Sequence, residues 1–245
     1  MLEGIRVALK VPYDDLMTDA VVDDMLKEVR LAARLKHPNI LPLKNADYID
    51  GRLVLAYPLG ERSLGQRMQS RISAQLAMDF SHQMLSAVAY AHEHRIIHCD
   101  IKPQNMILFP GNQLMLTDFG IAKVAYRTMV KASGSGTVGF CAPEQAMGKP
   151  SLASDVFSLG LVMYRLFSGR LPEYPFDWPP PNYTSVKKKV HAELLAVMRR
   201  AMEVNPRKRY PHAGAMLAAF QKCKAKAIKS TTNGRATKRK SSTRR

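Results

Sequence analysis

The sequence predicts an α+β protein in which a smaller, strand-rich lobe precedes a larger, mainly helical lobe. Three observations support this prediction. Short β-branched segments and a hairpin signal fall within residues 1–57, apolar segments at helical spacing dominate residues 58–221, and residues 222–245 contain almost nothing apolar. Strands and helices that occur in separate blocks along a chain are typical of the α+β class.

The smaller lobe is predicted to contain three strands and one helix. The strands are expected over residues 4–11, 42–48 and 52–57, and the helix over residues 18–35. β-Branched residues alternate around Lys10, as in a strand, whereas residues before His37-Pro-Asn39 have the apolar spacing of a helix that ends there. The dipeptide Asp50-Gly51, which is favoured in hairpin turns, joins the last two strands.

The larger lobe is predicted to consist of helices around an irregular centre. Helices are expected over residues 73–92, 154–168, 194–203 and 211–222. In each of them apolar residues recur on one helical face. Residues 96–116 are expected to form short strands and loops, and residues 120–139 a long loop. The prolines of residues 172–181 exclude regular structure in that segment.

The net charge of +17 is concentrated at the C-terminal end. All 20 acidic residues precede residue 222, and the last 24 residues include ten Lys or Arg. Residues 222–245 cannot offset their ordering entropy by burying apolar surface, so they are predicted to be a disordered tail. We expect weak, non-specific contact of this tail with nucleic acid or acidic partners. A phosphorylation substrate and a solubilising extension are the two other interpretations.

The first residues and the cysteines bear on the expected cellular location of the protein. The start MLEGIRVALKVP has no secretory signal pattern, and no apolar stretch is long enough to span a membrane. Cys99, Cys141 and Cys223 are odd in number and far apart, as expected for reduced thiols. The expectation is a cytoplasmic protein without a membrane segment.

Two polar segments carry the residue types that phosphoryl transfer requires. They are His98-Cys-Asp-Ile-Lys-Pro-Gln-Asn105 and Asp118-Phe-Gly120. This reaction needs a carboxylate to accept the hydroxyl proton, a cation at the transferred phosphoryl group, and oxygen ligands for Mg²⁺. Asp100 can be the base, Lys102 the cation at the γ-phosphate, and Asn105 and Asp118 the metal ligands.

These two segments resemble motifs of the protein kinase family. HCDIKPQN is similar to the family's H-R-D-x-K-x-x-N catalytic loop, DFG to its metal-binding motif, and Val7-Ala-Leu-Lys10 to its V-A-I-K strand. The resemblance implies a bilobal kinase-like fold, with ATP and Mg²⁺ as cofactors. It also implies that Asp100 and Lys102 are catalytic, and that Lys10 holds the α- and β-phosphates.

The resemblance extends to the remaining nucleotide contacts. Glu28 falls where the family has the glutamate that pairs with the lysine equivalent to Lys10. Leu55-Ala-Tyr-Pro58 falls at the hinge, so backbone groups of Ala56 and Pro58 are expected to face the adenine. Pro58 has no N–H to donate, which predicts weaker adenine recognition.

Other matches imply structural roles and a class of acceptor. Ala142-Pro-Glu144 resembles the A-P-E motif, Asp155 the aspartate that anchors the catalytic loop, and Arg209 the partner of Glu144. Lys102 and Gly136-Thr137 resemble Ser/Thr kinases rather than tyrosine kinases. The implied substrate is a protein Ser or Thr hydroxyl.

The sequence departs from the family pattern at three places. Cys99 replaces an arginine that binds a phosphate on the activation loop, so a weaker dependence on loop phosphorylation is expected. Only nine residues precede Lys10, too few for two strands and a glycine-rich loop. We expect a reduced N-lobe with weakened nucleotide binding, or else a truncated gene product. After Ser168 little room remains for a substrate-docking helix.

The resulting hypothesis is an ATP-dependent protein Ser/Thr kinase. Its predicted parts are a reduced N-lobe over residues 1–57, a C-lobe over 58–221 and a basic tail over 222–245. A pseudokinase or nucleotide-binding scaffold without turnover is the main alternative, favoured by the missing loop and opposed by the intact polar residues. A nucleic-acid-binding protein that merely has this fold is a third interpretation, and it rests on the tail alone.

Overall fold

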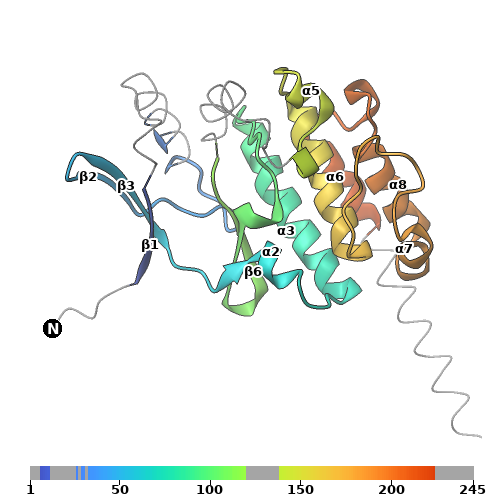
Figure 1. Ribbon diagram of the computed structural model, residues 1–245, viewed down its shortest axis with the longest axis horizontal. Coiled ribbons are helices and arrows are strands. Elements are labelled where there is room, and N and C mark those ends of the chain that lie inside the picture. The colour runs from blue at the N-terminus through green and yellow to red at the C-terminus, as the bar shows by residue number, and fades with distance from the viewer. Residues whose placement is uncertain (1–5, 12–25, 27–28, 31–32, 120–137, 224–245) are drawn as a thin grey trace, which may run out of the picture.

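The computed structural model describes residues 6–11, 26, 29–30, 33–119 and 138–223. Two three-stranded sheets lie toward one side of the molecule and the long helices toward the other (Figure 1). The α+β class predicted from the sequence is therefore confirmed.

The first sheet forms the smaller lobe. It contains β1 (Val7–Lys10), β2 (Asn45–Ile49) and β3 (Arg52–Pro58) in the order β1-β3-β2, with both pairs antiparallel. Three of the predicted strands are thus present, shifted by a few residues at their ends. Residues 26, 29, 30 and 33 are helical, in line with the predicted helix, most of which lies outside the described residues.

A small core holds this lobe together. Leu53 and Leu55 on β3 are buried with Val29, and Leu26, Leu43 and Tyr57 pack against them. Because side chains alternate across a strand, Leu53, Leu55 and Tyr57 lie on one face of β3. Lys10 is paired with Leu55 in the register, so it belongs to the same face of the sheet.

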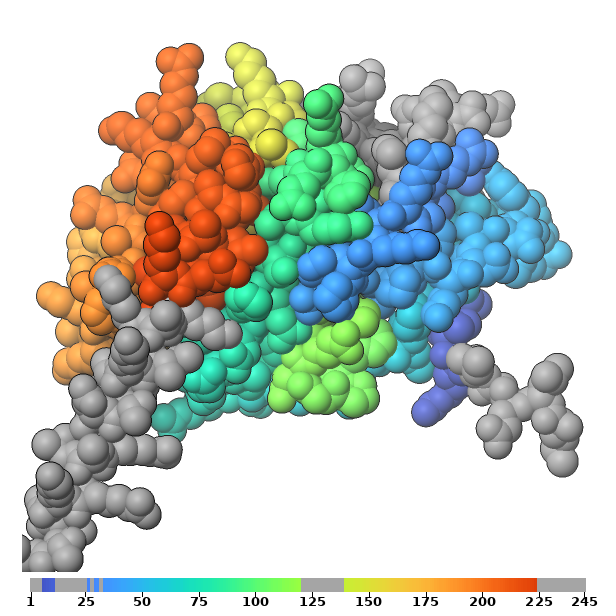
Figure 2. All heavy atoms as spheres, turned by 180° about the vertical axis from the view of Figure 1, so that it is seen from behind, coloured from blue at the N-terminus to red at the C-terminus, as the bar shows by residue number. Residues whose placement is uncertain are grey.

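The second sheet connects the smaller lobe to the helices. It contains β4 (Arg62–Ser63), β5 (Met106–Phe109) and β6 (Gln113–Leu116), all antiparallel. A parallel bridge joins Ile40 to Leu116, and the chain before β2 lies against this hairpin on the face seen in Figure 2. The strand β4 and the one-turn helix α2 (Leu64–Arg67), capped by Ser63, were not predicted.

The larger lobe is organised around one helix. Its elements are α3 (Ala74–Glu93), α5 (Pro143–Ala146), α6 (Leu152–Ser168), α7 (Tyr183–Lys189), α8 (Ala192–Ala201), a helix over residues 213–223, and the 3-10 turns η2 (Pro103–Asn105), η3 (Pro110–Asn112), η4 (Val138–Phe140) and η5 (Pro206–Lys208). Most of α6 is buried, and it packs against both α3 and α8 (Figure 1). The four predicted helices of this lobe are confirmed.

One helix of this lobe was not predicted. The sequence after Ser168 was expected to leave little room for a substrate-docking helix, which stays a prediction; the short helix α7 follows the proline-rich segment. Trp178 packs edge-on against Tyr183 at 5.3 Å between ring centroids, and Val186 is fully buried. Burial of these side chains stabilises a helix that its short length alone would not.

The boundary between the lobes stays a prediction, although the hydrophobic cores bear on it. Leu35 and Ile40, placed in the smaller lobe by the sequence, belong to the core cluster of the larger lobe. The strand β3 ends at Pro58, one residue past the expected limit. In the described ranges no helix combines the length and apolar character needed to cross a bilayer.

The close approach of α6 to α8 makes a testable prediction. A Cβ atom at Gly160 would lie 2.8 Å from the Ala201 Cβ and 3.0 Å from the Met202 Cγ. Gly160→Leu is expected to lower the free energy of unfolding by about 1–3 kcal/mol, because the helices must separate. Urea denaturation measures the loss. Gly65→Ala is the matched control, since its Cβ meets nothing closer than 3.5 Å; equal stability of the two variants would contradict the prediction.

Candidate active site

The predicted catalytic loop, residues 98–105, is anchored by a buried carboxylate. Asp155 of α6, 1% exposed, accepts hydrogen bonds from the backbone N–H of His98 at 2.7 Å and of Cys99 at 2.9 Å. The Nε2 atom of His92 on α3 lies 2.9 Å from the same carboxylate. A buried carboxylate must be paired in this way, and the pairing joins two helices to the loop. The role expected for Asp155 matches these contacts.

His98 connects the loop to the segment that carries Asp118. Its Nε2 donates to the Thr117 carbonyl at 2.9 Å, and its Nδ1 accepts the Asp100 backbone N–H at 3.2 Å. One ring nitrogen donates and the other accepts, as in a neutral imidazole. The His98 ring also packs against Phe119, with 4.7 Å between centroids. Two segments separated by 19 residues of sequence are thereby held side by side.

Three of the predicted site residues form one polar cluster. The Lys102 Nζ lies 2.7 Å from the Asp100 Oδ2. The Asn105 Nδ2 donates to the same Oδ2 and to the Asp100 carbonyl, both at 2.8 Å. The Asp100 carboxylate is about a third exposed, so an incoming hydroxyl can reach it. The structure therefore brings together Asp100, Lys102 and Asn105.

An ion pair between the two lobes completes the cluster. The Lys10 Nζ on β1 bonds to the Asp118 Oδ1, across 108 residues of sequence. Asp118 has a φ of 66°, a left-handed conformation that is uncommon for a residue other than glycine. Glu28 lies outside the described residues, as do Gly120, Gly136 and Thr137. The pairing of Lys10 with Glu28 stays a prediction.

The donor set fits a hard divalent cation. Because the Asn105 amide nitrogen is bonded to Asp100, its Oδ1 is left for a metal, and Asp118 keeps its second carboxylate oxygen beside Lys10. Amide and carboxylate oxygens are the ligands that Mg²⁺ takes in proteins. Asn105 and Asp118 are therefore chemically suited to hold Mg²⁺, with phosphate oxygens and water as further ligands.

One backbone carbonyl of the predicted hinge already accepts a hydrogen bond. The Ala56 carbonyl accepts the Lys44 backbone N–H at 2.8 Å, which leaves it a single lone pair for an adenine. Leu55 is fully buried behind it, and Pro58 ends the strand. The adenine contacts of Ala56 and Pro58 stay predictions.

Tyr57 is a site residue that the sequence analysis missed. It lies on the same face of β3 as Leu55, and it packs against the core of the smaller lobe. Burial raises the pKa of the Tyr57 phenol to about 12, and the nearby Asp118 carboxylate adds to the effect. The alternation of Leu53, Leu55 and Tyr57 along a predicted strand was the signal that could have found it.

Glu144 and Arg209 form the bidentate pair expected from the family. The two nitrogen-to-oxygen distances are 2.7 and 3.0 Å, and Arg209 is 2% exposed. Arg209 donates further to the backbone carbonyls of Ala153, Glu203 and Val204. Burial alone would raise the pKa of Glu144, but hydrogen bonds from Arg209 and Ser154 outweigh it and hold that pKa below its usual range.

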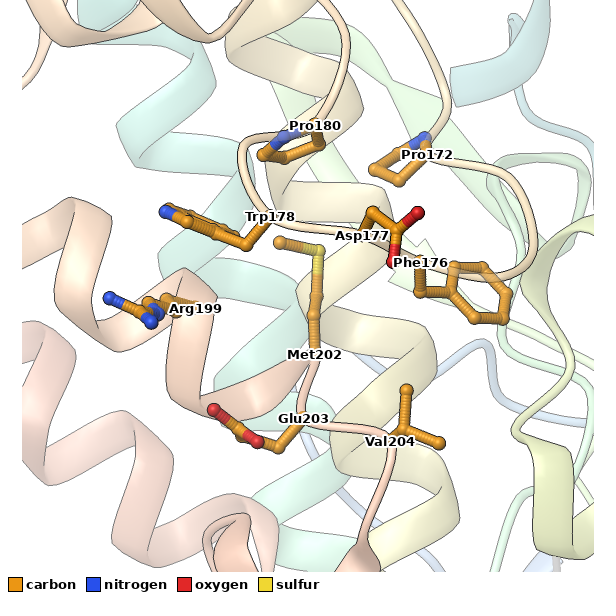
Figure 3. Close-up of a pocket in the computed structure, with 9 residues that line it drawn as sticks. All are labelled: Pro172, Phe176, Asp177, Trp178, Pro180, Arg199, Met202, Glu203 and Val204. Carbon is orange, nitrogen blue, oxygen red and sulfur yellow. The ribbon is translucent and has the colours of Figure 1, made fainter.

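A hollow in the larger lobe is separate from this cluster. Figure 3 shows it between the proline-rich segment and the end of α8, with Trp178 and Phe176 on opposite sides. Its lining residues are Pro172, Phe176, Asp177, Trp178, Pro180, Arg199, Met202, Glu203 and Val204. The Arg199 guanidinium already lies over the Trp178 ring, 5.4 Å from its centroid. No predicted site residue lines this hollow.

The fold and the site define a protein kinase domain. The family model for the protein kinase domain matches residues 2–239, so the chain belongs to this family. Among its relatives, serine/threonine-protein kinase PknA of Mycobacterium tuberculosis is 32% identical over 91% of this chain and 56% of PknA. Serine/threonine-protein kinase PrkC of Bacillus subtilis is 32% identical over 68% of this chain and 27% of PrkC. The chain thus spans about half the length of PknA and about a quarter of the length of PrkC.

A solved structure has the same fold. The PknI kinase domain of Mycobacterium tuberculosis, as a double mutant, superposes with a TM-score of 0.69 at 25% identity. The match covers 88% of this chain and 84% of that one. The kinase-like bilobal fold inferred from the sequence is therefore confirmed.

Proposed function

We propose that this chain is a protein Ser/Thr kinase that transfers the γ-phosphoryl group of ATP to protein hydroxyls. The observation that carries the proposal is the cluster of Asp100, Lys102 and Asn105 within hydrogen-bond distance of one another, beside the Lys10–Asp118 pair. The names of the relatives PknA and PrkC, both serine/threonine-protein kinases, support it.

The chemistry assigns one task to each side chain. The oxygen of a Ser or Thr hydroxyl attacks the γ-phosphorus, the bond from that phosphorus to the β,γ-bridging oxygen breaks, and ADP leaves. The Asp100 carboxylate accepts the hydroxyl proton, and Lys102 neutralises charge on the transferred group. Lys10 holds the α- and β-phosphates. Mg²⁺, when held by Asn105 and Asp118, supplies further charge neutralisation at the phosphates.

We further propose that the 245-residue polypeptide binds ATP weakly. Pro58 lacks an N–H, and the Ala56 carbonyl is already hydrogen-bonded. Fewer backbone groups are therefore left to bind the adenine than the family pattern offers. We expect the substrate-binding lobes to divide near residue 57, with residues 222–245 making weak electrostatic contacts with acidic partners or nucleic acid. A cytoplasmic location stays a prediction from the sequence.

A transfer assay tests the proposal. The polypeptide is incubated with γ-labelled ATP, Mg²⁺ and a generic basic protein, and label on Ser and Thr is counted. Label above that of the Asp118→Asn variant is expected, since this variant removes a metal ligand. No label in a folded preparation would exclude the kinase.

A thermal-shift titration distinguishes the scaffold alternative. The intact polar cluster favours binding of Mg²⁺ and ATP at millimolar concentrations, so the melting temperature is expected to rise. The Lys10→Met variant is expected to lose most of that rise, because its phosphate contact is gone. A rise without transfer of label would indicate a nucleotide-binding scaffold, and no rise would exclude a nucleotide site.

A further inference from the structure

The peptide unit that precedes the proposed base is held at both ends by side chains. The Cys99 carbonyl accepts a hydrogen bond from the Gln145 Nε2 at 2.5 Å. The Asp100 N–H of the same peptide donates to the His98 Nδ1 at 3.2 Å. One peptide plane thus has its C=O and its N–H each bonded to a different segment of the chain.

This peptide needs such support because of its backbone conformation. Cys99 has a φ of 66°, in the left-handed region that costs free energy for residues other than glycine. Strained residues of this kind persist only where the surrounding structure holds them in place. Asp155 holds the Cys99 N–H, and Gln145 holds the Cys99 carbonyl.

Gln145 is itself placed by strong contacts. It is 5% exposed and lies on α5, directly after Glu144. Glu144 forms the bidentate pair with Arg209, which fixes α5 against η5 and the start of α6. One residue of α5 therefore anchors that helix, and the next reaches the catalytic loop.

We propose that Gln145 is a positioning residue for the phosphoryl transfer proposed above, an inference that rests on that proposed function. By holding the Cys99 carbonyl, Gln145 sets the orientation of the peptide between Cys99 and Asp100, and with it the position of the Asp100 carboxylate. The amide–carbonyl bond contains no charged group and no phosphate. The loop is thereby oriented without the arginine–phosphate pair that Cys99 in this position rules out.

The Gln145→Met variant tests the inference. Methionine has a similar length but no N–H donor, so the buried Cys99 carbonyl loses this hydrogen bond. Gln83→Met is the matched control: Gln83 also bridges backbone groups, donating to the Asn112 carbonyl at 3.1 Å and accepting the Leu114 N–H at 2.7 Å. Neither of these two hydrogen bonds involves a residue of the polar cluster.

The kinetic readout separates positioning from folding. In Gln145→Met we expect kcat to fall by roughly ten- to a hundredfold, the loss typical of a misplaced catalytic group. The KM for ATP is expected to stay within about twofold of the wild-type value, because no phosphate contact changes. In Gln83→Met kcat is expected to be unchanged at a temperature where both variants are folded.

Hydrogen exchange gives a readout that needs no activity. The amide hydrogens of residues 98–105 are expected to exchange about tenfold faster in Gln145→Met than in wild type, and at the wild-type rate in Gln83→Met. If the wild type transfers phosphate but the two variants have equal kcat and equal exchange, the positioning role alone is overturned. A wild type that transfers none overturns the proposed function, and the positioning role with it.

Discussion

Asp100→Asn is expected to lower kcat for phosphoryl transfer by about 10²- to 10⁴-fold. The amide cannot accept the hydroxyl proton, and a positioned base contributes a factor of this size. The replacement keeps the shape of the side chain and one oxygen for the bond from Asn105. Nucleotide binding is therefore expected to remain. Radiolabel transfer to a basic protein measures the first effect, and a thermal shift with Mg²⁺ and ATP the second.

The matched control for this variant is Asp79→Asn. Asp79 lies on α3, where Gln75 donates to both of its oxygens at 3.1 and 3.2 Å, and it is not part of the polar cluster. This variant removes the same charge and is expected to keep the wild-type kcat. If Asp100→Asn retained transfer within about twofold of Asp79→Asn, Asp100 would not be the base.

Arg209→Met is expected to lower the free energy of unfolding by about 3–5 kcal/mol. This variant leaves the partly buried Glu144 carboxylate without its cation, and it removes donors from three backbone carbonyls. Urea denaturation measures the change. Arg207→Met, at an exposed position on η5, is the matched control and is expected to stay within about 0.5 kcal/mol of wild type.

A compensating variant identifies the cause of this loss. Glu144→Gln combined with Arg209→Met removes both charges, so the pair of changes is expected to cost less than the sum of the single ones. Strict additivity would show that the ion pair itself does not stabilise the fold.

The acid dependence of stability follows from the same pair. The pKa of Glu144 is lower in the folded chain than its ordinary value of about 4.3. Its contribution is therefore complete above the ordinary value and is lost as the pH falls through the lower, folded pKa. Between pH 7 and pH 3, wild type is expected to lose more stability than Glu144→Gln. Parallel losses in urea titrations at the two pH values would contradict the assignment.

The sequence was a good guide wherever the determining interactions are local. Helical spacing identified α3, α6 and α8, and the Asp50-Gly51 turn identified the β2–β3 hairpin, because a side-chain period or a turn residue acts over a few neighbours. It was a poor guide for α7, whose formation depends on the packing of Trp178 and Val186 rather than on propensity.

The residues of the candidate site likewise fall into those that the sequence identified and one that it did not. Asp100, Lys102 and Asn105 lie within six residues of sequence, so the motif already implied that they meet. The structure places the Lys102 Nζ 2.7 Å and the Asn105 Nδ2 2.8 Å from the Asp100 Oδ2. Tyr57 was overlooked because its closeness to Asp118 arises only when β3 and the segment that carries Asp118 meet in the folded chain.

By itself, then, the sequence determined the order of the elements and the chemistry available to the catalytic loop, since both are written in short stretches of neighbouring residues. Only the tertiary structure decided that Lys10 meets Asp118 and that Gln145 holds Cys99. These partners are separated by 108 and 46 residues of chain. Their meeting depends on the packing of β1, α5 and α6 around the loop, and no local pattern encodes that packing.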